Sequence, residues 1–462
     1  MNENLIYFLI IHLSAILADI LVLGALGHMV YQRREPTSMI AWLLAIILIP
    51  YVAVPLYFIF RSRKLKRKTK SQIELASRRE VVAEKATDLD MILRGNGIAG
   101  ATLGNRFEFY TDGVEAYKAL MEQIQTAQKQ ILFSTYVFSS DEVAKSILKE
   151  LTRKASQGVS VKLLIDSIGS LPLYLFQSPL KELKKAGGQI AFYMPLLTRP
   201  FQNYINLRNH RKIFLFDDKT VLAGGMNLSR EYMGPVPCDD RWQDILFLVQ
   251  GPAVFHYRKI FTEDWNHTAR EKLDFSEYMP DSCGDTGIQV VPSGPDIASD
   301  ALYEALLSAV FTAKERIWLV TPYFVPDKSL MQALIIARHR GVDVKLITPE
   351  SSNHLIADLG RSSYMRELLA NGIEVCLYQA GMIHAKAILI DEKGVMMGSA
   401  NIDQRSLFLN YEVISFIYSD KIIAASEKWM KMLLEQSIGR MKPASRWRRM
   451  GENLMSIFAP ML

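Results

Sequence analysis

The chain has 462 residues, a formal net charge of +6 and 49% hydrophobic residues. The length allows about two to four domains, and the apolar content excludes a mostly disordered chain. The basic excess is too small to indicate a partner such as nucleic acid. The cysteines Cys238, Cys283 and Cys376 lack zinc-binding spacing and are interpreted as free thiols in a reducing compartment.

Two long apolar runs occupy the N-terminus. From Leu5 to Val30 the only charged residue is Asp19, and residues 39–60 contain no charge. A transmembrane helix needs about 20 apolar residues, so each run is long enough to cross a bilayer. A cleaved signal peptide is disfavoured because the start, MNEN, has no basic residue. We therefore predict a transmembrane hairpin over residues 1–60, with helices at about 5–30 and 39–60 and with Asp19 facing the partner helix.

The distribution of basic residues predicts the orientation of this hairpin. Residues 61–70, RSRKLKRKTK, include seven basic residues, whereas the basic residues of the short loop between the runs are Arg33 and Arg34. The positive-inside rule places the larger cluster in the cytoplasm, where it also suits anionic lipid headgroups. We expect residues 61–105 to be a basic juxtamembrane segment and linker that leads into a cytoplasmic catalytic part.

The remainder of the chain is a duplication. HRKIFLFDDKTVLAGGMNLS (210–229) and HAKAILIDEKGVMMGSANID (384–403) carry histidine, lysine, aspartate, glycine and asparagine in identical register. Upstream, GVSVKLLI (158–165) matches GVDVKLIT (341–348). Because there are only two copies, we predict two similar halves, 106–285 and 286–462, and not a solenoid.

Each half alternates helical and strand-like stretches. Residues 113–130 and 143–157 have helical spacing before the strand-like VKLLID, and residues 301–315 and 329–340 have it before VKLITP. This alternation is typical of an α/β fold with a largely buried sheet. We expect the two halves to pack side by side as a pseudo-dimer.

Each repeated motif combines side chains that can bind and transfer a phosphoryl group. Residues i and i+2 of a strand point to the same face, so the histidine and lysine of HxK should lie together. The motif aspartate should end the strand, and the asparagine should follow the returning strand beside small residues. The candidate residues are His210, Lys212, Asp217 and Asn227 in the first half and His384, Lys386, Asp391 and Asn401 in the second.

Two such sets that face each other suit phosphodiester exchange. One imidazole can attack phosphorus while the other protonates the leaving alkoxide, and the lysines and asparagines can stabilise charge on the phosphoryl oxygens. Since lysines supply the positive charge, we expect neither a metal nor another cofactor. A single HxK is usually structural, but two full motifs in register favour catalysis.

These motifs resemble the signature of the phospholipase D superfamily, and the chain from about residue 20 to its end resembles bacterial cardiolipin synthases. The similar stretches are REPTSMIAWLLAIILIP (34–50), RNHRKI (208–213), GGMNLSREY (224–232), TPYFVPD (321–327) and GSANIDQRSLFLNYE (398–412). The resemblance implies two phospholipase D-like α/β halves behind the hairpin. It also implies a multi-pass protein of the bacterial inner membrane.

The resemblance implies roles for single residues as well. Glu412 stands where relatives place a carboxylate that orients the imidazole of His384, and Asp244 is the comparable candidate for His210. By the same analogy, His210 is the nucleophile and His384 the general acid. The motif aspartates Asp217 and Asp391 are then expected to be structural.

The leading expectation is phosphatidyl transfer between two phosphatidylglycerols, giving cardiolipin and glycerol through a phosphohistidine, with anionic membrane lipid as the partner. The alternatives are a hydrolytic phospholipase D, a transferase using another alcohol, a membrane-tethered nuclease and a non-catalytic lipid-binding scaffold. The apolar stretch LPLYLF (171–176), without a basic-aromatic groove pattern, favours lipid over nucleic acid. Two intact motifs argue against the scaffold.

Overall fold

The structure is a computed structural model that describes residues 3–31, 36–60, 87–195, 206–297 and 299–458. The chain forms two compact units. One contains residues 1–63 and 196–207, and the other contains residues 64–195 and 208–462. The basic cluster at 61–70 and the arginines of the short N-terminal loop lie outside the described residues.

The N-terminal unit is helical, with α1 (Glu3–Tyr31), α2 (Pro36–Leu48) and α3 (Pro50–Phe60). The second predicted helix, over 39–60, was expected to be kinked by its prolines, and the structure divides it at Ile49, directly before Pro50. Proline has no backbone N–H and clashes with the preceding turn, so it commonly ends a helix. Asp19 is exposed and does not face a partner helix as predicted.

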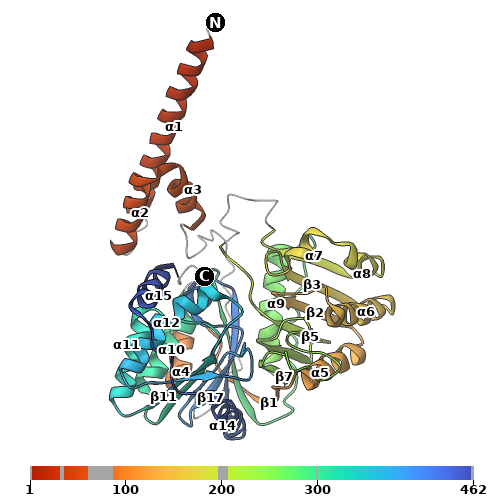
Figure 1. Cartoon of the computed structure of the whole chain (residues 1–462). Helices are drawn as coiled ribbons and strands as arrows, with labels where there is room; N and C mark the ends of the chain where they lie inside the picture. The colour runs from red at the N-terminus through yellow and green to blue at the C-terminus, as the bar shows by residue number, and fades with distance from the viewer. Residues whose placement is uncertain (1–2, 32–35, 61–86, 196–205, 298, 459–462) are drawn as a thin grey trace. The chain divides into compact units, whose positions relative to one another are not determined.

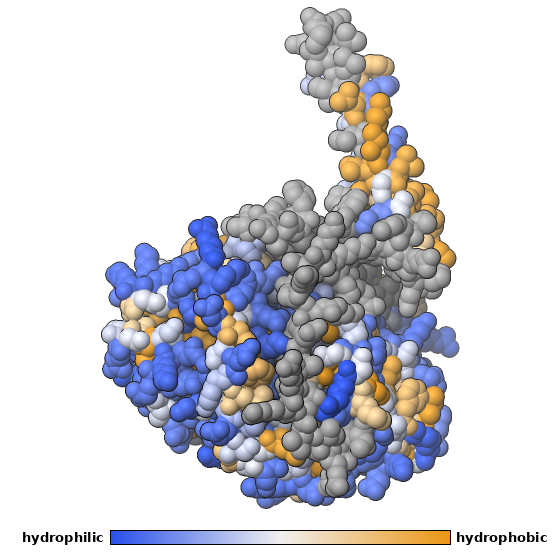
Figure 2. All heavy atoms as spheres, turned by 180° about the vertical axis from the view of Figure 1, so that it is seen from behind, coloured by the Kyte–Doolittle hydropathy of each residue, from blue (hydrophilic) through white to orange (hydrophobic). Residues whose placement is uncertain are grey.

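A small apolar cluster joins the N-terminal helices, in which Ala25 packs with Ile46, Ala53 and Tyr57. Many of the remaining apolar side chains of this unit are exposed, and they form the orange surface of these helices in Figure 2. Within the described part of the chain, no helix combines the length and the apolar character needed to cross a membrane.

The second unit is built on one 15-stranded sheet, in the order β17-β12-β11-β9-β13-β14-β16-β8-β1-β7-β6-β5-β2-β3-β4. The first half supplies β1 (Thr102–Tyr110), β2 (Gln130–Thr135), β3 (Ser160–Asp166), β4 (Gln189–Tyr193), β5 (Ile213–Phe216), β6 (Thr220–Gly224) and β7 (Leu246–Gln250). The second half supplies β8 (Thr286–Ser293), β9 (Arg316–Val320), β11 (Asp343–Pro349), β12 (Glu374–Tyr378), β13 (Ala387–Ile390), β14 (Gly394–Gly398), β16 (Glu412–Tyr418) and β17 (Ser437–Ile438). The short strands β10 (Phe324–Val325) and β15 (Ile402–Asp403) pair separately.

The strand order of one half mirrors that of the other about the antiparallel pair β1–β8. Figure 1 shows the halves side by side, the first in orange to green and the second in cyan to blue. The prediction of a duplicated α/β fold is confirmed. The duplicated apolar strands are buried on both faces, as expected for a sheet between helices.

Helices flank the strands of both halves. The first half has α5 (Gly113–Thr126), α6 (Glu142–Ser156), α7 (Leu171–Leu175), the 3₁₀ turn η2 (Ser178–Leu180), α8 (Lys181–Lys185) and α9 (Val254–Thr268). The second half packs against α4 (Thr87–Gly95) and has α10 (Ala301–Thr312), α11 (Lys328–His339), α12 (Leu355–Ala370), α13 (Gln404–Phe408), α14 (Asp420–Glu435) and α15 (Arg446–Phe458). The helices predicted at 113–130, 143–157, 301–315 and 329–340 are confirmed as α5, α6, α10 and α11.

The directions of the strands place both HxK motifs at the same edge of the sheet. In the first half, β2, β3 and β4 are mutually parallel and β5 runs antiparallel to β2. In the second half, β9, β11 and β12 are parallel and β13 runs antiparallel to β9. The residues before β5 and β13 therefore lie at the edge where the parallel strands end. Both HxK motifs occupy these positions.

Candidate active site

The histidine and lysine of each motif directly precede a strand. β5 begins at Ile213, after Lys212, and β13 begins at Ala387, after Lys386. The expectation that His210 and Lys212 belong to a regular strand is therefore wrong. Short backbone bridges to the opposite half hold these segments instead of a sheet ladder.

The first bridge joins the segment of His210 to the second half of the chain. The His210 N–H donates to the carbonyl of Tyr411 at 2.9 Å, and the Tyr411 N–H donates to the carbonyl of Arg208 at 2.9 Å. Tyr411 is followed by Glu412, the first residue of β16. The bridge therefore brings a carboxylate of the second half to the histidine of the first.

The second bridge repeats this arrangement with the halves exchanged. The His384 N–H donates to the carbonyl of Gln243 at 2.7 Å, and the Gln243 N–H donates to the carbonyl of Met382 at 2.8 Å. Gln243 is followed by Asp244. The duplication thus produces two equivalent crossed connections at one site.

Each histidine consequently pairs with the carboxylate of the other half. His210 Nδ1 lies 3.0 Å from both Glu412 Oε1 and Oε2, and His384 Nδ1 lies 2.7 Å from Asp244 Oδ2. The predicted pairing of Glu412 with His384 and of Asp244 with His210 is wrong. Spacing along the chain suggested partners within one half, whereas the bridges pair a segment of each half with a segment of the other.

The residue after the glycine that both motifs share, Gly224 or Gly398, differs between the halves and fits the carboxylate beside it. A Cβ atom at Gly225 would lie 2.2 Å from Asp244 Oδ1, so a side chain there would displace the carboxylate. The equivalent residue is Ser399, whose hydroxyl donates to Glu412 Oε2 at 2.5 Å. The small residues of GGMN and GSAN therefore position the orienting carboxylates.

The two lysines are buried beside the histidines. Lys212 Nζ donates to the carbonyl of His210 at 2.8 Å, and Lys386 Nζ lies 2.8 Å from His384 Nδ1 and 3.2 Å from Nε2. Burial lowers the pKa of Lys212 to about 7 and that of Lys386 to about 8. The charge of Lys386 lowers the pKa of Lys212 further. An anionic phosphate between them would relieve this repulsion.

The electrostatics keep the imidazoles neutral and the carboxylates charged. Burial lowers the pKa of His210 against the opposing effect of Glu412, and both lysines lower it further. Burial, Lys386 and Lys212 likewise lower the pKa of His384 against Asp244. Burial alone would raise the pKa of Glu412, but His210 and Lys212 lower it. A neutral imidazole has a free lone pair, as a nucleophile or general base requires.

The two motif asparagines have different surroundings. Asn227 Oδ1 accepts from the Val137 N–H at 3.1 Å, and its Nδ2 donates to the Tyr232 hydroxyl at 3.0 Å. The predicted phosphate-binding amide of Asn227 is thus engaged within the protein. Asn401 Oδ1 is buried and accepts no hydrogen bond from any described residue.

Tyr232 is a site residue that the sequence analysis did not single out. Its hydroxyl lies 3.4 Å from His384 Nε2, and its ring meets the imidazole edge-on with centroids 5.0 Å apart. Burial and Asp244 raise the pKa of Tyr232, so its hydroxyl remains a donor. The tyrosine ends the stretch GGMNLSREY, but its distance from the second motif in sequence gave no sign of this contact.

The aspartates of the two motifs lie at the far end of their strands. Asp217 accepts from the backbone N–H groups of Gln128, Lys129 and Gln130 at 2.7–2.9 Å. Asp391 accepts in the same way from Lys314, Glu315 and Arg316 at 2.9–3.2 Å. Both have a positive φ, 52° and 47°. The carboxylates therefore stabilise the turns that precede β2 and β9.

Buried ion pairs hold the residues on both sides of His210 in place. Arg211 Nη1 lies 2.7 Å from Asp264 Oδ1, and Arg208 Nε lies 3.1 Å from Asp166 Oδ2. The Asn209 N–H also donates to Asp166 at 3.0 Å. Residues on both sides of His210 are thus held by fully buried partners, which restricts the position of the imidazole.

Comparisons with known proteins agree with this geometry. Residues 120–265 and 306–434 match the family described as cardiolipin synthase, PLD-like domain, and residues 20–61 match the family described as phospholipase D-nuclease N-terminal. A cardiolipin synthase of Clostridium perfringens (strain SM101 / Type A) is 31% identical over 93% of this chain and 95% of its own. The major cardiolipin synthase ClsA of Bacillus subtilis (strain 168) is 32% identical over 93% of this chain and 95% of its own.

Among solved structures, the phosphatidylserine synthase of Haemophilus influenzae Rd KW20 has the same fold. Its TM-score is 0.61 at 16% identity, covering 81% of this chain and 97% of that one. The duplicated sheet with a histidine, a lysine and a crossed carboxylate from each half defines a phospholipase D-like protein. The extent of the sequence match narrows this class, and the chain belongs to the cardiolipin synthase family.

Proposed function

We propose that this chain is a phosphatidyltransferase that converts two phosphatidylglycerols into cardiolipin and glycerol. In the substrate complex the phosphate offsets the charge of the lysines and His384 is an imidazolium; His210 Nε2 attacks phosphorus, the glycerol oxygen leaves with the Nε2 proton of His384, and a phosphatidyl-histidine forms beside neutral His384. The primary hydroxyl of a second phosphatidylglycerol then gives its proton to His384 and attacks the same phosphorus. This releases cardiolipin and neutral His210, so protons and bonds balance.

The crossed histidine–carboxylate pairs carry this proposal. A carboxylate on Nδ1 fixes the tautomer and leaves Nε2 as the reactive nitrogen of each imidazole. Lys212 and Lys386 supply positive charge where the phosphoryl oxygens would lie. Because the site is buried, this charge stabilises the transition state more strongly than it would in water. Asp217 and Asp391 support the strands and do not act on the substrate.

Incubation of the purified chain with phosphatidylglycerol alone tests this function. Cardiolipin and glycerol should form, and added glycerol should drive the reaction backwards. His210→Asn and His384→Asn should each remove most of the activity. If phosphatidic acid is the dominant product at every lipid density, the chain is a hydrolase. If product appears only with another added alcohol, the acceptor is that alcohol.

We also propose that the N-terminal helices attach the chain to the bacterial inner membrane as a hairpin, with the catalytic part in the cytoplasm. The predicted division of the chain into domains, 1–60, 61–105, 106–285 and 286–462, is kept, except that the first half begins at Thr102 with β1. The support is the apolar surface of α1 to α3, where Leu13 is 71% exposed, Leu48 76% and Tyr51 78%. The basic residues of 61–70 favour the cytoplasmic side.

Cysteine labelling tests this orientation. In a Cys238→Ser/Cys283→Ser background, a cysteine at Thr37 should react with an impermeant reagent on intact cells, and one at Thr69 should react only after lysis. If both cysteines react only after lysis, the loop between the two helices is also on the cytoplasmic side. The reverse pattern would invert the orientation.

A further inference from the structure

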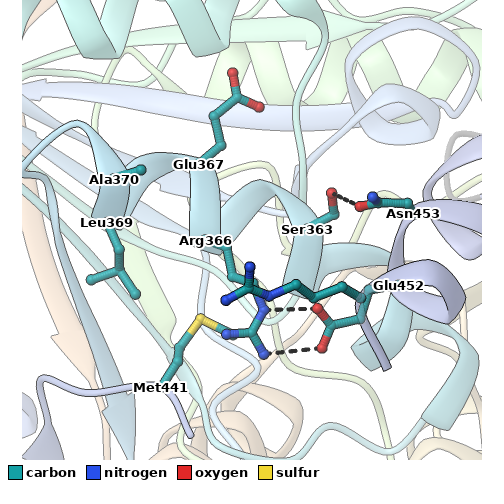
Figure 3. Close-up of a pocket in the computed structure, with 9 residues that line it drawn as sticks. Ser363, Arg366, Glu367, Leu369, Ala370, Met441, Glu452 and Asn453 are labelled. Carbon is teal, nitrogen blue, oxygen red and sulfur yellow. Dashed lines mark hydrogen bonds and ion pairs between the residues drawn. The ribbon is translucent and has the colours of Figure 1, made fainter. Parts of the chain in front are cut away.

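The C-terminal helix α15 (Arg446–Phe458) is docked by its polar face. Glu452, which is 1% exposed, accepts from Arg366 Nε at 2.7 Å and Nη2 at 3.1 Å. The Ser363 hydroxyl donates to Asn453 Oδ1 at 3.1 Å. Figure 3 shows these contacts between α12 and α15, beside a hollow of about 460 Å³ that Arg449 also lines.

The apolar face of the same helix is exposed. Trp447 is 80% exposed, Met450 61% and Leu454 57%. At 3.6 residues per turn, these positions form one stripe, and Glu452 lies on the opposite side of the helix. A helix on the surface of a protein usually buries its apolar stripe in the core. α15 does the reverse, so its stripe is available to another apolar phase.

Positive charge surrounds this stripe. Residues 440–453 contain five basic residues and one acidic residue, a net charge of +4. The acidic residue is the buried Glu452, so the exposed charge of the segment is basic. Arginine beside tryptophan and aliphatic side chains is the composition of helices that lie in a membrane interface, where the cations meet anionic headgroups.

The segment begins at the edge of the sheet that carries the motifs. Lys442 Nζ lies 3.3 Å from Oε1 of Glu350, the residue after β11. Other exposed apolar side chains follow the ends of the equivalent strands β3 and β11. Phe176, after α7, is 72% exposed, and Leu355, the first residue of α12, is 76% exposed.

We propose that α15 and residues 440–445 form a second lipid-binding surface, which lies in the interface of an anionic bilayer through Trp447, Met450 and Leu454. The choice of an anionic lipid rests on the charge of the segment and on the proposed function. In this position α15 holds the motif edge of the second half against the layer from which phosphatidylglycerol is drawn. α15 follows the last strand of the duplicated sheet, so this contact would be asymmetric between the halves.

Spin labelling of the full chain in phosphatidylglycerol vesicles tests the proposal. Met450→Cys is labelled in the Cys238→Ser/Cys283→Ser background, and Met432→Cys on α14, where the native methionine is 50% exposed, is the matched control. The label at 450 should be accessible to oxygen and protected from a water-soluble nickel chelate. The label at 432 should show the opposite pattern. Zwitterionic vesicles should reduce the protection at 450.

Each other outcome overturns the proposal. Equal nickel access at 450 and 432 means that the stripe stays in water, and protection from both reagents means that protein covers it, for example a second copy of the chain. Equal protection in zwitterionic vesicles removes the role of charge. The labels report depth even in a chain that makes no cardiolipin, so failure of the proposed function gives a different result.

Steady-state kinetics test whether this surface contributes to turnover. The triple variant Trp447→Ser/Met450→Ser/Leu454→Ser changes exposed side chains and should keep the melting temperature of the parent. On vesicles, its KM in units of surface phosphatidylglycerol should rise several-fold with little change in kcat. In detergent micelles the difference should nearly vanish. An unchanged KM on vesicles would show that α15 contributes nothing to the approach of substrate.

Discussion

Glu412, from the second half of the chain, is the carboxylate partner of His210, from the first, with both carboxylate oxygens 3.0 Å from Nδ1. Asp244 and His384 form the reciprocal pair at 2.7 Å. Neither half therefore contains a complete histidine–carboxylate pair. Both halves are needed for the site, because each half supplies the carboxylate that hydrogen-bonds the histidine of the other.

The crossing predicts which carboxylate serves which chemical step. Asp244→Asn should impair the His384 proton transfer, and Glu412→Gln should impair attack by His210, each by about 10²–10⁴-fold with phosphatidylglycerol. A phosphatidyl ester of p-nitrophenol has a leaving group that needs no proton. Release of p-nitrophenol should therefore be largely restored in Asp244→Asn and remain low in Glu412→Gln.

The controls for this experiment are the histidines themselves and one exposed glutamate. His384→Asn should follow Asp244→Asn, and His210→Asn should follow Glu412→Gln. Glu182→Gln, whose side chain is 71% exposed, should behave as the parent. If the p-nitrophenyl ester instead rescues Glu412→Gln, the nucleophile is His384 and the assignment of the two histidines is reversed.

The sequence predicted much of the fold because the duplication is visible in both motif and pattern. α5, α6, α10 and α11 lie where the helical spacing placed them, and β5 ends before Asp217 as expected. The periodicity of local stretches depends on residues that are close in the chain. Contacts within one element or one hairpin are therefore predictable in this way.

The errors concern contacts across the two halves. Glu412 follows His384 at a plausible spacing, and nothing local indicates that the Tyr411–Asn209 bridge carries it to His210. The contact of Tyr232 with His384 arises from the same crossing. Such contacts depend on the antiparallel joining of β1 and β8, a property of the assembled sheet.

The lysine pKa values predict a falling rate at alkaline pH. Burial lowers the pKa of Lys212 to about 7 and that of Lys386 to about 8. Each ammonium is present below its pKa and is lost as pH rises through it. The kcat/KM for phosphatidylglycerol, which reports the free enzyme, should therefore fall between about pH 7 and 8.5 as this positive charge disappears.

The acidic side of the profile should extend below the ordinary histidine range. The pKa of His210 is lowered, first by burial, so the neutral nucleophile persists as pH falls below 6.5. Lys386→Arg is the comparison, because arginine keeps its charge throughout this range. The kcat/KM of this variant should therefore decline less at alkaline pH than that of the parent, because only Lys212 still loses its charge. A flat profile from pH 6 to 9 in the parent would contradict the lowered lysine pKa values.

Tyr232→Phe should weaken the general-acid step. The hydroxyl lies 3.4 Å from His384 Nε2 and accepts from Asn227, so its removal leaves the imidazole less well oriented. A neutral hydrogen bond contributes about 0.5–1.5 kcal/mol, which corresponds to a loss of roughly 2- to 12-fold in kcat. The loss should be smaller with the p-nitrophenyl ester. Tyr278→Phe, at an exposed position, is the matched control and should leave kcat unchanged.

The motif aspartates should affect stability more than chemistry. Asp217 and Asp391 each accept from three consecutive backbone N–H groups, in turns that precede β2 and β9. Asparagine tolerates their positive φ but removes the charge and one acceptor. A hydrogen bond to a charged group contributes about 1.5–3 kcal/mol, so Asp217→Asn or Asp391→Asn should lower the melting temperature measurably. The kcat of the folded fraction should stay within about twofold of the parent, since charge-assisted bonds to backbone do not touch the phosphate. A normal melting temperature with abolished turnover would instead give these aspartates a direct part in catalysis.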